Sequence, residues 1–190
     1  MQQIIIFASG RGSNAQAIID YFKENGKASV ALIVSNKAEA GVLEIAKTEH
    51  IPFLLVDRKT FGEALLIDQL QTYKPALIVL AGFLWKLPEG LVKAFEGRIV
   101  NIHPALLPKY GGKGMYGHNV HNAVLASGDA QSGITIHSVN EAYDEGAILI
   151  QVQCPVAPGD TAEMLAARVH SLEHFYYPRT IHYLLDTLPA

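Results

Sequence analysis

Asn101 and His103 carry the side chains in this sequence that are best suited to acyl chemistry. They close a short apolar run over 98–104 (Arg-Ile-Val-Asn-Ile-His-Pro), which predicts a buried strand that Pro104 stops. Residues two apart in a strand point to the same side, so the amide and the imidazole should lie together. An amide can donate to a developing oxyanion, and an imidazole can move a proton near neutral pH. The alternative is that both side chains only satisfy nearby backbone groups.

A glycine loop lies near the N-terminus at residues 9–14 (Ser-Gly-Arg-Gly-Ser-Asn). It follows an apolar strand predicted over 3–8 and precedes a helix predicted over 14–25. A strand, a glycine loop and a helix in that order can hold an anion on free backbone N–H groups at the helix N-terminus. We therefore expect the loop to bind one phosphate through Gly12, Ser13 and Asn14. The alternative is an ordinary turn in which Ser13 or Asn14 caps the helix.

The same loop matches the dinucleotide-binding fingerprint, with Ala15 in the third glycine position. Such a site needs a carboxylate at the end of the second strand to hold a ribose. The second strand, predicted over 30–34, is followed by Ser-Asn-Lys and has no carboxylate there. The sequence therefore disfavours a dinucleotide.

A second candidate ligand segment follows the apolar strand predicted over 77–81. Residues 82–87 (Gly-Phe-Leu-Trp-Lys-Leu) place large side chains at the edge of the sheet, where a flat pteridine-like ring could bind. The alternative is that Phe83, Leu84 and Leu87 pack against the next helix.

Beyond His103, the stretch 106–118 contains four glycines and predicts a loop beside the site, as active-site lids often are. The turn 140–146 contains Asp144, which the fold could bring against His103. That turn joins two strands close in sequence, predicted over 133–139 and 147–152, which favours an antiparallel pair at the sheet edge.

The remaining pattern alternates strands and helices, so the predicted fold is α/β. We expect a doubly wound, mostly parallel sheet with helices on both faces, in which the ends of the strands 3–8 and 99–102 are neighbours. Further elements are predicted as a helix over 41–50, a strand over 52–56, a helix over 60–73 with Leu65 inward, a helix over 119–126, and a helix that starts at a capping box of Asp160 and Glu163, reaches Pro178 and is followed by a last helical piece to Leu188.

Composition sets the class of protein. A chain of 190 residues with 49% hydrophobic residues is expected to form a single domain over 1–190. The net charge of −3 gives no broad attraction to nucleic acid or to an anionic membrane. The single cysteine, Cys154, fits a reducing cytoplasm as a packed residue, and no signal peptide is expected.

The sequence offers no nucleophile of its own for acyl transfer. It has neither a G-x-S-x-G elbow nor an H-E-x-x-H motif, and its histidines are not spaced as metal ligands, so no metal is expected. A site of this kind must bring two small-molecule substrates together, one of which is the nucleophile.

Four motifs together resemble the folate-dependent formyltransferases, over essentially the whole chain. They are Ser9-Gly10-x-Gly12-Ser13-Asn14, Leu80-Ala81-Gly82-Phe83, Asn101-Ile102-His103-Pro104-x-Leu106-Leu107-Pro108 and Asp144-x-Gly146. The Asn-x-His-Pro block of the third motif, with the distal aspartate, is a specific signature of the family. The glycine loop is most similar to that of members that formylate glycinamide ribonucleotide in purine biosynthesis.

The resemblance implies a Rossmann-like formyltransferase fold and direct transfer from 10-formyltetrahydrofolate, without a metal. It implies that Asn101 and His103 stabilise the oxyanion, while Asp144 fixes the imidazole and supports proton movement. The phosphate would lie on Gly12, Ser13 and Asn14, with Glu173 facing the sugar. A monomer or a homodimer in the cytoplasm would fit, without nucleic-acid or membrane partners.

The folate contacts that the resemblance implies form a larger set: Lys59, Leu84, Trp85, Lys86, Leu87, Asn101, Asn140, Glu141 and Tyr143. Lys59 stands where the family commonly has arginine, and the loop 110–118 is several residues longer than in well-known members.

Three other functions are consistent with parts of this pattern. Members of the family that deformylate the folate with water usually have an added N-terminal regulatory domain. Members that formylate initiator methionyl-tRNA have an added C-terminal domain and a basic surface. Neither feature is expected in this chain of 190 residues. The third is a non-catalytic nucleotide-binding module, in which only the glycine loop would act.

Overall fold

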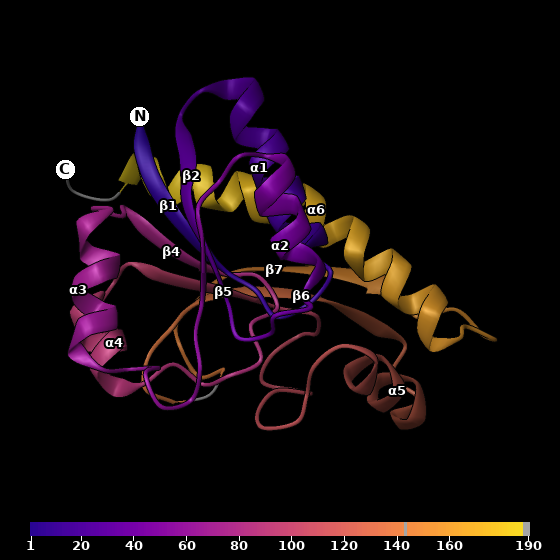
Figure 1. Cartoon of the computed structure of the whole chain (residues 1–190). Coiled ribbons are helices and arrows are strands. Elements are labelled where there is room, and N and C mark those ends of the chain that lie inside the picture. The colour runs from indigo at the N-terminus through magenta and orange to yellow at the C-terminus, as the bar shows by residue number, and fades with distance from the viewer. Residues whose placement is uncertain (143, 188–190) are drawn as a thin grey trace.

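The computed structural model describes residues 1–142 and 144–187. At its centre is a seven-stranded sheet in the order β3-β2-β1-β4-β5-β6-β7 (Figure 1). The first five strands pair in parallel, and β6 is antiparallel to both β5 and β7. The strands are β1 Gln2–Phe7, β2 Ala28–Ser35, β3 Phe53–Leu55, β4 Leu77–Leu80, β5 Ile99–His103, β6 Gln131–Ser138 and β7 Ile148–Pro155. This confirms the predicted doubly wound sheet with an antiparallel C-terminal edge.

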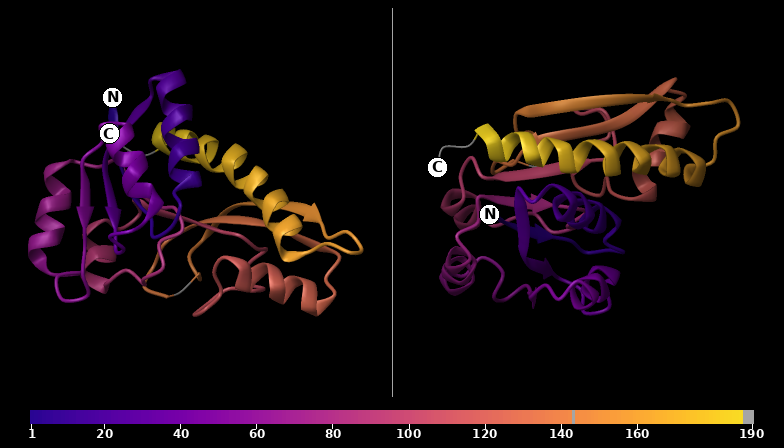
Figure 2. Two further views of the ribbon diagram at one scale, coloured as in Figure 1. Left: turned by 45° about the vertical axis from the view of Figure 1, so that its right-hand side comes forward. Right: turned by 90° about the horizontal axis from the view of Figure 1, so that it is seen from above.

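Helices cover both faces of the sheet (Figure 2). They are α1 Ser13–Asn25, α2 Gly41–Thr48, α3 Ala64–Thr72, α4 Glu89–Ala94, α5 His118–Ser127 and α6 Ala162–Thr187. Residues of α1, α2 and α6 pack on one face, and residues of α3 and α4 pack on the other. Among the helices described, none is both long enough and apolar enough to span a lipid bilayer.

The unbroken apolar run of β1 follows from this two-sided burial. Ile4 and Ile6 join the first core cluster, whereas Ile5 and Phe7 join the second. Both faces of a central parallel strand are covered by helices, so its sequence does not alternate between apolar and polar residues. Cys154 is buried in the first cluster, as expected for a packed residue.

The expectation that the ends of β1 and β5 are neighbours is wrong, because β4 lies between them. The loop after β4 therefore separates the glycine loop from Asn101 and His103. Ser9, at the start of the glycine loop, connects it to the loops that follow β4 and β2. Its hydroxyl accepts the N–H of Leu84 at 2.9 Å and donates to Asn36 Oδ1 at 2.6 Å.

Helix α3 begins at Ala64 and not at Thr60 as predicted. The carboxylate of Asp57 accepts the backbone N–H groups of Lys59 and Thr60, at 2.8 and 2.9 Å, and so forms a turn where the helix was expected. The prediction that Leu65 faces inward is also wrong, because 76% of its surface is exposed.

Helix α6 differs from its prediction at its start. It begins at Ala162, so its cap is Thr161, whose hydroxyl accepts the N–H of Met164 at 3.3 Å. The predicted capping residue Asp160 instead accepts hydrogen bonds from Arg168 at 2.7 and 3.1 Å.

Two predicted helical pieces are one helix that passes through Pro178. An internal proline costs a helix about 3 kcal/mol. Here Pro178 is buried with Tyr177 and Ile181, so packing against the sheet offsets that cost. The predicted end at Leu188 lies outside the described residues.

Tyr177 connects α6 to the strands that carry the site. It is fully buried, and its hydroxyl lies 2.9 Å from the carbonyl oxygen of Leu80 and 3.1 Å from that of Val100. Val100 directly precedes Asn101, so this contact fixes the end of β5 against the helix.

We expect Tyr177→Phe to lower the free energy of unfolding by about 1–3 kcal/mol, because it leaves buried carbonyl oxygens without their donor. Urea denaturation measures this change. The control is Tyr183→Phe on the same helix, whose side chain is 67% exposed and should give almost no change. Equal stability of the two variants would contradict this role of the hydroxyl.

Candidate active site

The imidazole of His103 is buried at the end of β5. Its Nε2 lies 2.7 Å from the carbonyl oxygen of Tyr110. Since a carbonyl only accepts, Nε2 carries the hydrogen, and in the neutral ring Nδ1 keeps a lone pair. Burial lowers the pKa of His103, and the Asp144 carboxylate and the Tyr110 carbonyl oppose this without outweighing it. The imidazole is therefore biased towards its neutral form, with Nδ1 free to accept a proton.

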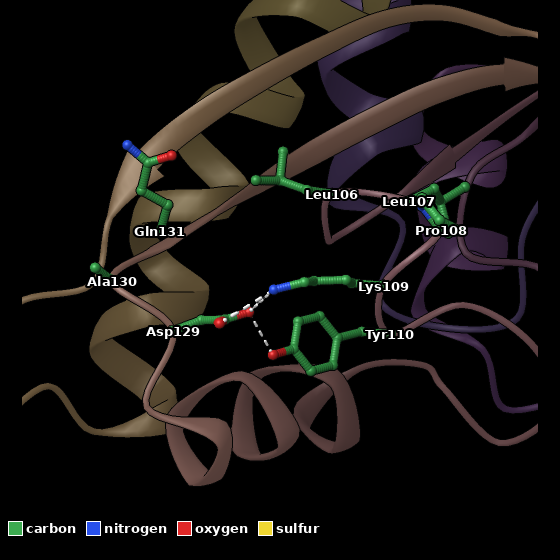
Figure 3. A pocket seen from close by; sticks show the side chains of 8 residues that line it. All are labelled: Leu106, Leu107, Pro108, Lys109, Tyr110, Asp129, Ala130 and Gln131. Carbon is green, nitrogen blue, oxygen red and sulfur yellow. Dashed lines mark hydrogen bonds and ion pairs between the residues drawn. The ribbon is translucent and has the colours of Figure 1, made fainter.

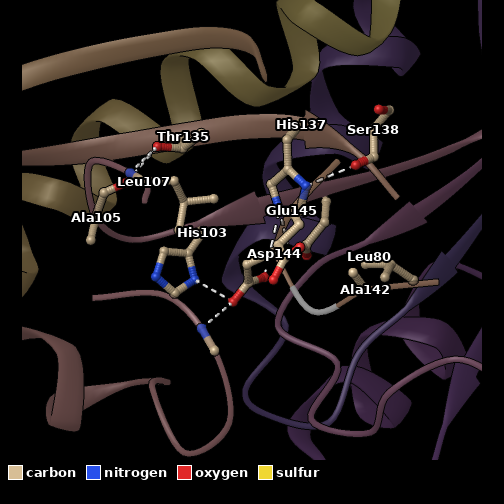
Figure 4. Close-up of polar contacts among 12 residues, drawn as sticks. Leu80, His103, Ala105, Leu107, Thr135, His137, Ser138, Ala142, Asp144 and Glu145 are labelled. Atoms are coloured by element: carbon tan, nitrogen blue, oxygen red, sulfur yellow. Dashed lines mark hydrogen bonds and ion pairs between the residues drawn. The ribbon is translucent and has the colours of Figure 1, made fainter. Parts of the chain in front are cut away.

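Asp144 lies beside this imidazole, as the sequence suggested. Its Oδ2 is 3.8 Å from Nδ1 of His103 and 2.9 Å from the backbone nitrogen of Gly112 (Figure 4). Burial alone would raise the pKa of Asp144, but the imidazole of His137, whose Nε2 lies 3.6 Å from Oδ1, and the hydrogen bond from the Gly112 N–H lower it. The carboxylate therefore stays ionised next to the imidazole. The closer partner of His103 is nevertheless the Tyr110 carbonyl, which fixes the ring in the way that the sequence had assigned to Asp144.

The turn that presents Asp144 depends on Gly146. A Cβ atom at Gly146 would lie 1.7 Å from the carbonyl oxygen of Ser138, so no other residue fits there. Asp144 itself has a φ of 54°, a left-handed conformation that aspartate tolerates better than most residues. In the motif Asp144-x-Gly146, the glycine is thus required by the close backbone approach, and the aspartate supplies the carboxylate.

Asn101 is oriented by a residue that the sequence did not identify as part of the site. His137 pairs with Asn101 across β5 and β6, and its Nδ1 donates to the carbonyl oxygen of Ser138 at 2.8 Å. In neutral His137, Nε2 accepts from the amide nitrogen of Asn101 at 3.1 Å. One amide hydrogen is thus held by His137, and the second remains to donate to a ligand. The register between β5 and β6 places His137 opposite Asn101, and the alternating sequence of β6 alone does not predict that register.

The glycine loop ends at Gly12, which has a φ of 85° and precedes α1. A Cβ atom there would lie 2.8 Å from side-chain atoms of Val42 and Ile45. No side chain among the described residues caps this helix N-terminus, so the alternative in which Ser13 or Asn14 caps the helix is not what forms. The N–H groups of the first turn are left for a ligand.

Glu173 of α6 lies against this helix N-terminus. Its Oε2 accepts from Asn14 Nδ2 at 3.1 Å and from His170 Nδ1 at 2.9 Å. The hydrogen bond to Glu173 raises the pKa of His170, whereas the nearby charge of Arg11 opposes that shift. The carboxylate thus connects the glycine loop to α6 and favours the protonated form of His170 near the loop.

An aromatic pocket adjoins Asn101. It is lined by Leu80, Phe83, Trp85, Lys86, Leu87, Asn101, His137, Val139, Asn140, Ala142 and Asp144. Its volume of about 60 Å³ is well below the roughly 300 Å³ at which ligand pockets usually begin. A ring that enters must therefore displace side chains. Phe61 and Phe83 contact Trp85 edge to face, and their ring centroids lie 5.4 and 6.3 Å from its own.

Three predicted folate contacts among the described residues do not line this pocket. The backbone N–H of Leu84 donates to the Ser9 hydroxyl at 2.9 Å, and the Glu141 carboxylate lies 3.8 Å from Lys93 Nζ on the surface. Lys59 is exposed, while the adjacent Arg58 stands 4.6 Å above the ring of Trp85. Tyr143 lies outside the described residues.

Comparison with known proteins accords with this geometry. The formyl transferase family matches residues 2–181. A phosphoribosylglycinamide formyltransferase of Bacillus subtilis is 38% identical over 97% of this chain and 95% of its own length. The chain belongs to the formyl transferase family.

Solved structures and plant relatives agree with this membership. The crystal structure of a phosphoribosylglycinamide formyltransferase from Bacillus halodurans superposes with a TM-score of 0.88 and 35% identity, over 98% of this chain and 96% of that one. A chloroplastic phosphoribosylglycinamide formyltransferase of Vigna unguiculata is 42% identical over 97% of this chain. This chain spans 61% of that relative's length.

A larger cavity in this formyl transferase family member lies behind the loop that follows β5. It measures about 520 Å³ and is lined by Leu106, Leu107, Pro108, Lys109, Tyr110, Asp129, Ala130 and Gln131 (Figure 3). None of the predicted catalytic residues lines it, so we take the smaller aromatic pocket as the ligand site. Among the described residues, no group of three or more acidic, histidine or cysteine side chains could hold a metal ion.

His121 of α5 is buried, and its Nδ1 has no hydrogen-bond partner in the described part of the chain. Burial lowers the pKa of His121 from 6.5 to about 4, and Glu173 opposes this only in part. Between these two pH values the unfolded chain binds a proton that the folded chain does not. The contribution of neutral His121 to the free energy of unfolding is therefore fully present above pH 6.5 and is lost as the pH drops towards 4.

We expect the free energy of unfolding to fall between pH 6.5 and 4 by up to about 1.4 kcal/mol per pH unit for this group. His121→Leu removes the ionisation and should make the decline shallower by that amount. Urea denaturation across the pH range measures it, with the exposed His50→Asn as control. An unchanged slope in His121→Leu would contradict the burial of a neutral imidazole.

Proposed function

We propose that this chain transfers the formyl group of 10-formyltetrahydrofolate to the amine of glycinamide ribonucleotide, a step of purine biosynthesis. The observation that carries the proposal is the position of Asn101, His103 and Asp144. Asn101 and Asp144 line an aromatic pocket that could take a pteridine. Glu173, whose charge acts on His103, contacts Asn14 at a helix N-terminus suited to a phosphate. The names of the relatives support the same acceptor.

The nucleotide would bind along the glycine loop. Its phosphate would accept from the N–H groups of Gly12, Ser13 and Asn14, with Arg11 supplying positive charge and His170 adding to it when protonated. Glu173 would face the sugar, because its carboxylate lies beside Asn14. From there the amine of the nucleotide would extend towards His103.

The folate would bind in the aromatic pocket. Phe83, Trp85 and Leu87 offer apolar surface for the ring, and Asn101, Asn140 and Asp144 offer hydrogen-bonding groups for its edge. The folate supplies the formyl carbon on which the nucleotide amine acts. Lys86, at the rim, and Arg58, over Trp85, would face the acidic end of the folate. Lys59, Leu84, Glu141 and Tyr143 remain predicted contacts.

The chemistry would proceed as follows. The second amide hydrogen of Asn101 donates to the formyl oxygen as negative charge develops on it, which is worth about 2.7–4 kcal/mol of barrier. Neutral His103 accepts the proton of the attacking amine on Nδ1, and ionised Asp144 stabilises the imidazolium that forms. The imidazolium then returns a proton to the leaving nitrogen. The proposal includes small-molecule substrates and no metal. It also includes a single domain over 1–190 that is a monomer or a homodimer in a reducing cytoplasm.

A formyl group labelled on the folate tests the proposal. With glycinamide ribonucleotide, initiator methionyl-tRNA and water as competing acceptors, we expect label on the ribonucleotide. Label on the tRNA or release as formate would identify another activity of the family. Binding of the ribonucleotide without any release of label would favour a non-catalytic nucleotide-binding module.

We expect His103→Ala and Asp144→Asn each to lower kcat at least ~100-fold, the usual minimum for losing acid–base catalysis. Nucleotide affinity should change little, because the phosphate would be held at the glycine loop, and isothermal titration calorimetry with the ribonucleotide measures it. Asparagine also tolerates the φ of 54° at position 144. His50→Asn, at an exposed site with a similar φ, is the control. Near-normal turnover in either active-site variant would remove that residue from the mechanism.

We expect Ser13→Asp to raise the KM for the nucleotide at least about tenfold, because a carboxylate at the helix N-terminus repels the phosphate. The same charge favours the helix itself, so the free energy of unfolding should not fall. Ser13→Ala is the matched control, since it keeps the backbone N–H, and its KM should stay near the wild-type value. If Ser13→Asp leaves the KM for the nucleotide unchanged, the phosphate does not bind at this loop.

A further inference from the structure

The Tyr110 carbonyl is the closest hydrogen-bond partner of His103, at 2.7 Å. Because it holds the hydrogen on Nε2, it keeps Nδ1 as the basic nitrogen next to Asp144. Without this contact, Asp144 would draw the hydrogen to Nδ1 and remove the lone pair that faces the carboxylate. The ability of His103 Nδ1 to accept a proton therefore depends on the position of the Tyr110 carbonyl.

That carbonyl belongs to a segment with little regular structure. Tyr110 has a φ of 57°, unusual for a residue other than glycine, and Gly111 and Gly112 follow it. No strand or helix holds Tyr110, because β5 ends at His103 and α5 begins at His118. Side-chain contacts must therefore fix the carbonyl.

Asp129, in the turn between α5 and β6, makes these contacts. Its Oδ2 accepts from the Tyr110 hydroxyl at 2.7 Å, and both carboxylate oxygens accept from Lys109 Nζ, at 3.2 and 2.9 Å (Figure 3). The hydrogen bonds from Lys109 and Tyr110 lower the pKa of Asp129, so it is ionised at neutral pH. The Tyr110 hydroxyl also lies 2.5 Å from the hydroxyl of Ser127.

We propose that Asp129 is a positioning residue for formyl transfer: through the Tyr110 hydroxyl it fixes the Tyr110 carbonyl, which sets the tautomer of His103. The inference rests on the proposed function for its kinetic consequence, but the tautomer itself is a property of the protein alone. Asp129 touches neither His103 nor the aromatic pocket, and no motif in the sequence pointed to it.

The hydrogen bond from Tyr110 carries this effect more than the ion pair from Lys109. The Lys109 side chain is 66% exposed, and an ion pair so open to water contributes about 0–1 kcal/mol. The Asp129 side chain is only 30% exposed, and Tyr110 is half-buried. Lys109→Gln is therefore a control in the same loop.

The charges around His103 make Tyr110→Phe the cleanest test. Asp144, His137 and Glu173 act on the imidazole, and His121 interacts with it from α5. Tyr110→Phe alters none of these groups and removes no formal charge near neutral pH. Because the carbonyl raises the pKa of His103, loosening it should lower that pKa further.

The test combines kinetics with NMR of the ¹⁵N-labelled full chain. In the free wild-type protein, long-range proton–nitrogen spectra should show His103 with its hydrogen on Nε2. Tyr110→Phe and Asp129→Ala should give a mixture of the two tautomers.

In kinetic measurements, both variants should lower kcat about fivefold, which corresponds to the loss of one ordinary hydrogen bond, with the KM of each substrate within about twofold of the wild-type value. The rising limb of the kcat–pH profile should move to lower pH, and Asp129→Asn should restore most of the loss, since its amide oxygen still accepts from Tyr110.

Tyr183→Phe and Lys109→Gln should match the wild type in all these measurements. Wild-type tautomer and pH profile in both Tyr110→Phe and Asp129→Ala would overturn the inference. So would Asp129→Asn being no better than Asp129→Ala. Absence of formyl transfer by the wild-type protein would instead reject the proposed function, and the NMR measurement would still decide the inference.

Discussion

A buried imidazole needs one partner for its hydrogen and one for the charge that it gains, and the site of this protein is arranged around that requirement at His103. The Tyr110 carbonyl takes the hydrogen of Nε2, and the Asp144 carboxylate stands 3.8 Å from Nδ1. The remaining features serve this arrangement. Gly146 lets the turn pass Ser138 closely enough to present Asp144, and Gly112 donates to the same carboxylate.

The position of β5 in the sheet explains why two substrates would meet there. β4 separates β5 from β1, so the glycine loop stands one strand away from His103. The antiparallel strand β6 lies on the other side and contributes His137, which holds the amide of Asn101. The aromatic pocket draws on the face covered by α3 and α4, whereas the glycine loop and Glu173 belong to the face covered by α1 and α6. A folate and a nucleotide could thus approach the end of β5 from opposite faces of the sheet.

Much of this arrangement could be predicted from the sequence, because it depends on local patterns. The apolar runs predicted the parallel strands, and the two-residue spacing of Asn101 and His103 predicted that both side chains lie at the end of β5. One failure was a local competition for backbone N–H groups, and the others depended on contacts between residues distant in sequence. Asp57 captures the N–H groups that would have begun α3, and burial carries α6 through Pro178. His137 enters the site through strand register, and Tyr110 enters through its backbone, which its residue type does not reveal.

A crystal structure with glycinamide ribonucleotide and a non-transferable analogue of the formyl folate tests the central claim most directly. The account predicts the phosphate on the N–H groups of Gly12 to Asn14. It also predicts the analogue's formyl oxygen about 3 Å from the Asn101 amide nitrogen, with the amine on the His103 side. A folate ring outside the aromatic pocket, or reacting atoms more than about 6 Å from both Asn101 and His103, would contradict it.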